Sequence, residues 1–199
     1  MKLITERLVL RSWRLDEVED AHRLWGDARV MRWVGPPHES QARSAAALEG
    51  ARAAEAEDGV CLWRVALRLS EPARGEGPFV GACGFLPYDG PGSRAPGERW
   101  LELGYHLLPD FWGRGLATEA AARCLRWARG EATRIVAFAD PQNLGSRRIL
   151  DKLGFMALPH HGGADEPIEH QLVCGSNAGH ALGVGPRREA MGRGLAKDP

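Results

Sequence analysis

Gly113 and Gly115 stand at the start of a long helical pattern, with a strand pattern on either side of it. The preceding strand is predicted over 100–107, and apolar residues then recur along one helical face from Leu116 to Ala128. The string TRIVAFA that follows is a continuous apolar run, which is typical of a buried strand. A strand, a glycine loop, a helix and a second strand in this order predict an α/β unit.

The first half of the chain predicts an antiparallel arrangement. Residues 61–69 and 78–88 are strand runs separated by the turn-rich SEPARGEG, a spacing that suits a hairpin. An alternating pattern over 5–13 predicts an earlier strand. Helices are expected after Asp16, which we interpret as an N-cap, and over 39–57.

The end of the chain predicts a short helix, a weak strand and a tail. The helix is LGSRRILDKLG, with Gly154 as its C-cap, and the strand covers 167–174. Residues 175–199 are rich in Gly and Arg and hold no aromatic residue. We therefore expect one domain over 1–174 and a disordered tail after it.

Composition narrows the class of protein. The 199 residues are 44% hydrophobic, enough for one core, and 26 Lys and Arg balance 26 Asp and Glu. No local basic patch predicts a nucleic-acid partner, and no apolar run approaches the roughly 18 residues of a membrane span. The four cysteines are scattered, so neither a disulfide framework nor a metal is expected. A cytoplasmic protein is the expectation.

The glycine loop is a candidate anion site. Successive amides of a glycine-rich loop that enters a helix converge with the positive end of the helix dipole. Gly113 and Gly115 would let the backbone approach a phosphate, and Arg114 adds a cation. The alternative is an ordinary strand-to-helix turn with an exposed arginine.

Three phosphate-binding designs compete for this loop. A Walker loop requires GxxxxGK followed by Ser or Thr, which the chain lacks. A dinucleotide fingerprint fits Gly113, Gly115 and the acid Asp140, but its third glycine is Thr118. That fold also requires further βα units, and the chain offers only one more helix. Acyl-CoA is the third candidate.

The acyl-CoA interpretation comes from a resemblance. DFWGRGLATEA, RIVAFAD and NLGSRRILDKLGF together resemble the core of the GNAT superfamily of N-acetyltransferases. TERLVLRSW and ELGYHL resemble its RimJ/RimL-type subgroup, which acetylates N-terminal amines of ribosomal proteins. The likeness covers about residues 3 to 173. It implies a GNAT fold, with a mixed, mostly antiparallel, splayed sheet and helices on both faces.

The resemblance also implies acetyl-CoA as co-substrate. The family's pyrophosphate loop reads Gln or Arg, two residues, Gly, one residue, then Gly or Ala, and Trp112 departs from it. An aromatic residue followed by glycine at that position resembles the loop sequence of the RimJ/RimL-type subgroup. The pantetheine arm would pair like an extra strand with ELGYHL, and Asn143, also an N-cap candidate, would lie beside it. The implied cofactor-binding residues are Leu103, Tyr105, Leu107, Trp112, Gly113, Arg114, Gly115, Leu116, Ala117, Thr118, Asn143 and Ser146.

Acetyl transfer to an amine requires a base for the amine proton, a donor to the oxyanion and an acid for the departing thiolate. Many GNAT members place a tyrosine acid where this chain has Leu150. Ser146 resembles a subgroup serine that could hydrogen-bond the thiolate, and the alternative is a plain helix serine. Glu102 matches a family carboxylate that acts as base; a solvated strand glutamate and a water chain are the alternatives. Tyr105 and His106 are secondary candidates.

The acceptor is expected to contact residues 33–38 and the loop 89–98. Trp33, Glu39 and Asp89 offer the aromatic and carboxylate groups that attract an amine cation, although ordinary surface residues would look the same. The implied acceptor is a primary amine, either a protein N-terminus or a small molecule, and a homodimer is left open. The alternative function, suggested by Leu150, is a catalytically silent acyl-CoA-binding module.

Overall fold

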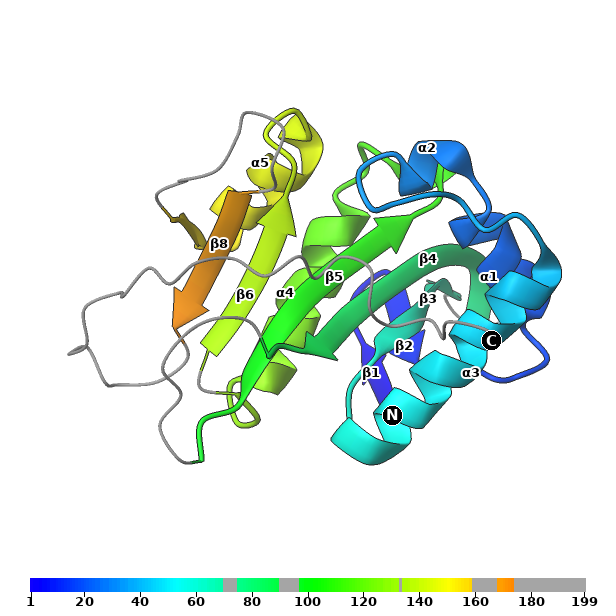
Figure 1. Ribbon diagram of the computed structural model, residues 1–199, viewed down its shortest axis with the longest axis horizontal. Helices are drawn as coiled ribbons and strands as arrows, with labels where there is room; N and C mark the ends of the chain where they lie inside the picture. The colour runs from blue at the N-terminus through cyan, green and yellow to red at the C-terminus, as the bar shows by residue number, and fades with distance from the viewer. Residues whose placement is uncertain (70–74, 90–96, 133, 159–167, 174–199) are drawn as a thin grey trace, which may run out of the picture.

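The computed structural model describes residues 1–69, 75–89, 97–132, 134–158 and 168–173 (Figure 1). Within them, one sheet has the strand order β1-β2-β3-β4-β5-β6-β8-β7, and only β5 and β6 are parallel neighbours. The expected α/β fold with a mixed, mostly antiparallel sheet is confirmed. The strands are β1 (Lys2–Ile4), β2 (Leu8–Arg11), β3 (Leu62–Leu69), β4 (Gly75–Pro87), β5 (Trp100–Leu107), β6 (Arg134–Ala139), β7 (Met156–Ala157) and β8 (Ile168–Val173).

The strand predicted over 5–13 is confirmed in part as β2 (Leu8–Arg11), but it is not the first strand, because β1 (Lys2–Ile4) precedes it and pairs with it as a hairpin. Thr5 makes the turn: its amide donates to the carbonyl of Leu8 at 2.9 Å, and its hydroxyl accepts from the amide of Leu8 at 2.8 Å. A side chain that bonds to the backbone three residues on favours a tight turn over an extended strand.

The helices of the first half differ from prediction at their ends. α1 (Val18–Trp25) has Glu17 as N-cap with no side-chain capping bond, so the prediction of Asp16 as N-cap is wrong. Asp16 instead pairs with Arg14 at the surface. α2 (Ala28–Met31) follows α1 where no separate helix was predicted, and α3 (Gln41–Asp58) begins two residues later than expected.

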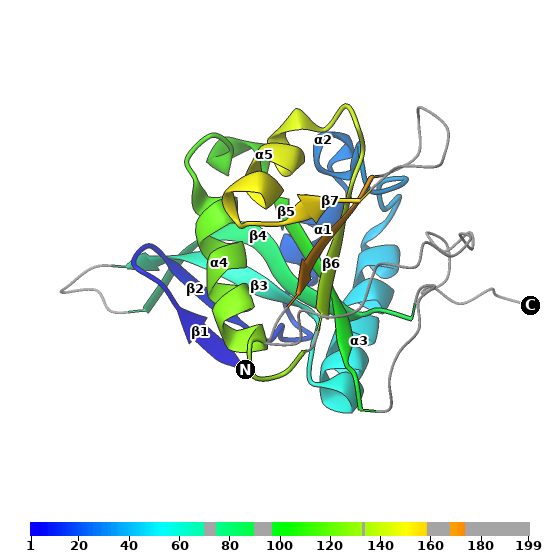
Figure 2. The same ribbon diagram turned by 90° about the vertical axis from the view of Figure 1, so that its left-hand side faces the viewer.

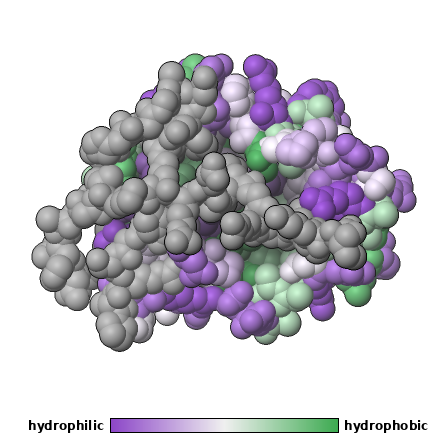
Figure 3. Space-filling view, viewed as in Figure 1, coloured by the Kyte–Doolittle hydropathy of each residue, from purple (hydrophilic) through white to green (hydrophobic). Residues whose placement is uncertain are grey.

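The helices form two layers around the sheet. α4 (Leu116–Ala128) and α5 (Leu144–Lys152) cover one face, and α1 and α3 cover the other (Figure 2). α4 packs on β4 and β5 through the helical face that the sequence predicts, and Ala120, Cys124 and Ala128 are fully buried. The exposed side of α3 mixes alanine with charged side chains (Figure 3).

The last predicted strand is confirmed over Ile168–Val173, whereas Pro167 and Cys174 lie outside the described residues. The expected tail over 175–199 also lies outside them. Among the described residues, no helix is long and apolar enough to cross a membrane. Nor do three or more His, Cys, Asp or Glu side chains gather in that part of the chain in a way that could hold a metal ion.

Candidate active site

The strands β5 and β6 separate in the middle of the sheet (Figure 1). Their parallel pairing joins Trp100–Glu102 to Arg134–Val136 and stops there, while β5 continues to Leu107 paired with β4 alone. We use "notch" for the opening bordered by residues 103–107 of β5 and 137–139 of β6. A notch of this kind leaves backbone hydrogen-bonding groups without a strand partner.

The backbone groups that face the notch belong to odd-numbered residues of β5. On this side the carbonyl of Arg99 accepts from the amide of Arg134 at 3.5 Å. The indole of Trp112 donates to the carbonyl of Leu107 at 2.6 Å on the same side. By this alternation, Leu103 and Tyr105 also direct peptide groups into the notch. An extended molecule with amide groups can pair with them as an added strand does.

The glycine loop follows at the end of the notch. Gly113 and Gly115 have φ values of +72° and +74°, a left-handed conformation that glycine adopts without strain. Gly115 is the N-cap of α4 and has no side chain to cap it. No amide from Gly113 to Thr118 donates a backbone hydrogen bond to a described residue. These free donors, with the positive end of the α4 dipole, can bind an anion.

Side chains of the loop separate into an anchored and an exposed set. Leu116 is 1% exposed and fixes the first turn of α4 in the core. Trp112 is 51% exposed, although its indole N–H is bound to Leu107. Arg114 is exposed, and its guanidinium lies 5.5 Å from the centre of the Phe111 ring. The role of Arg114 as a cation for a bound anion therefore stays a prediction.

The turn between β1 and β2 supports this loop, which the sequence analysis did not predict. Glu119 accepts from the Thr5 hydroxyl at 2.5 Å and from the Arg7 amide at 3.0 Å. Arg7 Nε donates to the other oxygen of Glu119 at 2.6 Å, and Arg7 Nη1 donates to the carbonyl of Arg114 at 3.0 Å. Thr5 and Arg7 stand in the string TER, but an alternating pattern in the sequence does not show which helix this turn will contact.

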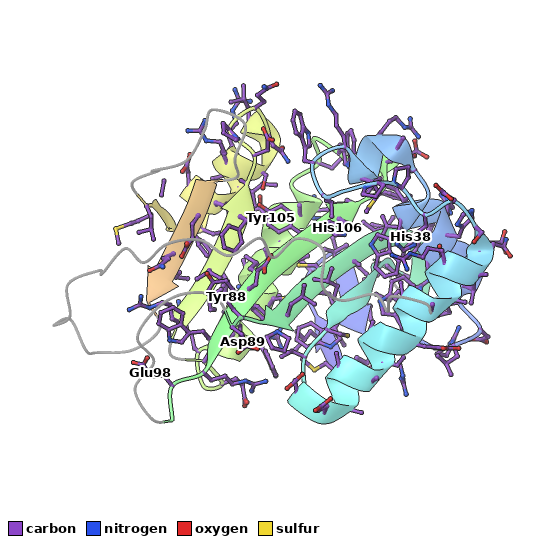
Figure 4. The ribbon with its side chains drawn as sticks, in the orientation of Figure 1. His38, Tyr88, Asp89, Glu98, Tyr105 and His106 are labelled. Carbon is purple, nitrogen blue, oxygen red and sulfur yellow. The ribbon has the colours of Figure 1, made fainter. Side chains whose placement is uncertain are left out.

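Two hydroxyl groups meet on the α5 side of the notch. Tyr105, from β5, and Ser146, from the first turn of α5, have their hydroxyl oxygens 2.8 Å apart, and the Tyr105 hydroxyl also donates to the carbonyl of Ser146 at 3.2 Å. Figure 4 places Tyr105 near the middle of the sheet. Desolvation raises the pKa of Tyr105 to about 12, so this phenol keeps its proton at neutral pH.

Asn143 fixes the position of Ser146. Its side-chain oxygen accepts from the Ser146 amide at 3.0 Å, which confirms Asn143 as the N-cap of α5. Leu150, where many family members have a tyrosine, is fully buried in the core. A hydroxyl at the notch therefore comes from Ser146 and Tyr105 rather than from the next turn of α5.

Glu102 lies on the opposite face of β5 from Tyr105, because side chains alternate along a strand. Desolvation by burial raises its pKa to about 7 and is the one cause of the shift. Glu102 occupies the last paired position before the notch opens. A carboxylate that titrates near neutral pH at this point can act as a general base.

His106 shares that face of β5 and is bound to α1. Trp25 Nε1 donates to His106 Nδ1 at 3.1 Å, and burial lowers the pKa of His106 to about 4. The ring is therefore neutral, with its proton on Nε2. Trp25 also packs on His38, with 5.8 Å between ring centres, and its carbonyl accepts from the His38 amide at 2.8 Å. These contacts join the segment 33–38 to β5 (Figure 4).

The three predicted acceptor residues do not come together. Trp33 is partly buried after α2, with the Arg32 guanidinium 4.5 Å from its ring centre. Glu39 is exposed just before α3. Asp89 lies beyond the end of β4, at the opposite end of β5 from His106 (Figure 4). Trp33 lies in the segment 33–38 that contacts Trp25, Glu39 follows it directly, and Asp89 lies elsewhere.

Comparison with known proteins agrees with this geometry. A family model described as an acetyltransferase (GNAT) domain matches residues 7–156. The protein YkkB of Bacillus subtilis (strain 168) is 31% identical over 157 residues, which are 77% of this chain and 84% of YkkB. The uncharacterized N-acetyltransferase p20 of Bacillus licheniformis is 29% identical over 158 residues, 77% of this chain and 81% of p20.

Solved structures share the fold. An acetyltransferase from Agrobacterium tumefaciens str. C58 has a TM-score of 0.66 at 24% identity and covers 86% of this chain and 94% of its own. RimL, a ribosomal L7/L12 alpha-N-protein acetyltransferase solved with coenzyme A, has a TM-score of 0.69 at 14% identity and covers 87% and 98%. Fold and site thus define an acyltransferase of the GNAT type. The chain belongs to the GNAT acetyltransferase family.

Proposed function

We propose that the protein transfers acetyl from acetyl-CoA to a primary amine by direct attack while both substrates are bound. The observation that carries this proposal is the continuity of two features. The peptide groups on the notch side of β5, which have no strand partner beyond the last pair with β6, lead toward the free amides of Gly113 to Thr118, and the Trp112 indole binds the last of them, the Leu107 carbonyl. A ligand with an amide-containing arm and a pyrophosphate matches that order of donors and acceptors.

The cofactor would lie along β5 and over the start of α4. Its pantetheine amides would pair with Leu103, Tyr105 and Leu107, and its pyrophosphate would accept from the loop amides with help from Arg114. Trp112 would act by its bond to the Leu107 carbonyl, which ties the loop to the end of the strand. RimL, which shares this fold, was solved in complex with coenzyme A, and this supports the proposed cofactor.

Glu102 is the proposed base, and Ser146 the proposed donor to the departing sulfur. The raised pKa of Glu102 leaves it able to accept a proton from the amine near neutral pH. Ser146 needs a hydroxyl proton to donate. Tyr105, protonated at this pH, can turn its one hydroxyl proton from the Ser146 carbonyl to Ser146 Oγ and so strengthen the Ser146 hydroxyl as a donor. Tyr105 is in this sense a positioning residue.

The acceptor would enter over the Glu102 face of β5. Trp33 and Glu39 lie in and beside the segment joined to His106, and His106 offers its Nε2 proton to an oxygen of the acceptor. Asp89 would meet only a long acceptor, because it lies at the other end of the strand. A peptide N-terminus has that length, and RimL is by name a protein acetyltransferase, so the RimJ/RimL-type subgroup is the proposed relative.

The deciding experiment measures thiol release from acetyl-CoA in the presence of alkylamines, amino acids and short peptides. We expect release that requires both acetyl-CoA and an amine, with an N-acetylated product identified by mass. CoA binding without turnover on any amine would instead support the silent module. The two hydroxyl groups at the notch argue against that module, because they supply donors that the missing tyrosine at Leu150 would have supplied.

A further inference from the structure

Arg7 reaches the glycine loop from the other end of the chain. Two of its three guanidinium nitrogens are bound: Nε to Glu119 at 2.6 Å and Nη1 to the carbonyl of Arg114 at 3.0 Å. The third, Nη2, lies 3.7 Å from the position that a Cβ on Gly115 would occupy, and it has no hydrogen-bond partner among the described residues. The Arg7 side chain is 48% exposed. Its free N–H groups therefore lie on the open side of the loop, next to the N-cap of α4.

The carboxylate of Glu119 lies close to the glycine loop, so an anion can bind there only if the positive charge of Arg7 offsets it. Its carboxylate stands in the first turn of α4, the same end of the helix that offers free amides to an anion. Desolvation raises the pKa of Glu119, but bonds from Thr5, the Arg7 amide and the Arg7 guanidinium outweigh it and lower that pKa. Glu119 is therefore ionised at neutral pH. Alone, it would repel a pyrophosphate that approached Gly115.

We propose that Arg7 is a cofactor-binding residue that neutralises Glu119 and donates from Nη2 to a pyrophosphate oxygen of CoA. The inference rests on the proposed function. It assigns a new role to the turn between β1 and β2, whose residues are more than 100 positions from the loop in sequence. Two hydrogen bonds hold the guanidinium in place before the ligand arrives, and a third holds the Arg7 backbone amide, so little side-chain freedom is lost on binding.

The test measures CoA affinity by calorimetry, so it needs no acceptor. We expect wild-type protein to bind CoA and Arg7→Gln to bind it roughly 10- to 100-fold more weakly, the range for one lost charge-assisted hydrogen bond. Arg7→Lys keeps a charge without the planar fork and should bind between the two. Glu119→Gln should bind at least as tightly as wild type, because it removes the repelling charge.

Two comparisons separate ligand binding from mere support of the loop. Arg7→Gln and Glu119→Gln break the same ion pair, so a purely structural role would weaken CoA binding equally in both, and that result would overturn the proposal. The double variant Arg7→Gln/Glu119→Gln should bind CoA more tightly than Arg7→Gln alone. Arg123→Gln is the matched control, because Arg123 joins α4 to the carbonyl of Ile4 at 3.3 Å away from the loop.

The phosphate that Arg7 contacts is tested with 3′-dephospho-CoA. Because Nη2 lies beside Gly115, Arg7→Gln should weaken CoA and 3′-dephospho-CoA by the same factor. A loss confined to CoA would place Arg7 on the 3′-phosphate and contradict the assignment. Thermal melting of each variant without ligand checks that it is folded. If Arg7→Gln is not folded, Arg7→Lys replaces it in the test. Failure of wild type to bind CoA would reject the proposed function itself, whatever the variants do.

Discussion

Glu102 is a carboxyl group whose surroundings raise its pKa to about 7 through desolvation. If it is the base, its charged form is present above that pH, so wild-type kcat should fall as pH decreases below about 7. Glu102→Gln should be slow throughout and recover in part at high pH, where the amine loses its proton in solution. Initial rates between pH 6 and 9 check this. A variant with the wild-type profile would show that water or another group is the base.

The same group makes stability depend on pH. The pKa of Glu102 in the folded state, about 7, exceeds the value of 4.5 for an unperturbed glutamate, so the folded protein binds the extra proton between these values. The free energy of unfolding should therefore decrease as pH rises from about 4.5 to about 7, by about 3 kcal/mol in all, so the protein becomes less stable. Glu102→Gln should lack this decrease in urea unfolding at pH 5 and pH 8. Glu57→Gln, on the exposed side of α3, is the control and should retain it.

Ser146 and Tyr105 are coupled by one hydroxyl contact of 2.8 Å, which a double-mutant cycle can measure. Ser146→Ala should lower kcat about 10- to 100-fold with little change in CoA affinity, because the bond matters as charge develops on sulfur. Tyr105→Phe alone should lower kcat relative to wild type. Introduced into the Ser146→Ala variant, it should lower kcat little further. Additive losses would mean that Tyr105 acts independently, and near-normal kcat in Ser146→Ala at every pH would remove the donor role.

At the scale of elements, the start of α4 is the feature on which cofactor binding depends. Gly115→Asp places a side chain and a negative charge where the pyrophosphate is expected, and CoA binding should be abolished. The left-handed φ of +74° adds a strain of about 1–2 kcal/mol. Gly154→Asp is the matched control, because Gly154 has φ +84° and open space after α5. It should lose similar stability and still bind CoA in titration calorimetry.

Local patterns predicted the elements around the notch. The helical period from Leu116 to Ala128 and the apolar run ending at Ala139 correspond closely to α4 and β6, because each pattern reflects burial of one element. The notch itself was expected only from the family resemblance. Its depth depends on the register at which β6 leaves β5 after Glu102, and register is a tertiary property.

The parts of the site that sequence reasoning missed are contacts between distant segments. Asn143 could be recognised as a cap because its partner is three residues away. Arg7 and Glu119 are 112 positions apart, and nothing in either local pattern joins them. Likewise, Tyr105 and Ser146 meet only because β5 and α5 border the same notch. Residue type indicated the chemistry at each position, whereas the pairing required the fold.

At the scale of the whole molecule, the sheet is weakest where the ligand is expected. The strands β1 to β5 form a continuous antiparallel unit, and three residue pairs join it to β6 and β8. α4 strengthens this junction, since it packs on β4 and β5 and also contacts α5. A ligand arm in the notch would add hydrogen bonds to β5 beside the junction. Binding should therefore stabilise both halves of the fold together.

Acetyl-CoA should accordingly raise the melting temperature of the entire chain in one transition. A ligand that binds only the folded state at a hundred times its dissociation constant adds about 2.7 kcal/mol of stability. For a chain of this length, that corresponds to a shift of roughly 5–10 °C. Differential scanning calorimetry with millimolar acetyl-CoA measures the shift, and Gly115→Asp should show none. An unmoved wild-type transition would remove the notch and the loop from any cofactor role, whereas a shift confined to one of two separate transitions would mean that the ligand holds only half of the sheet.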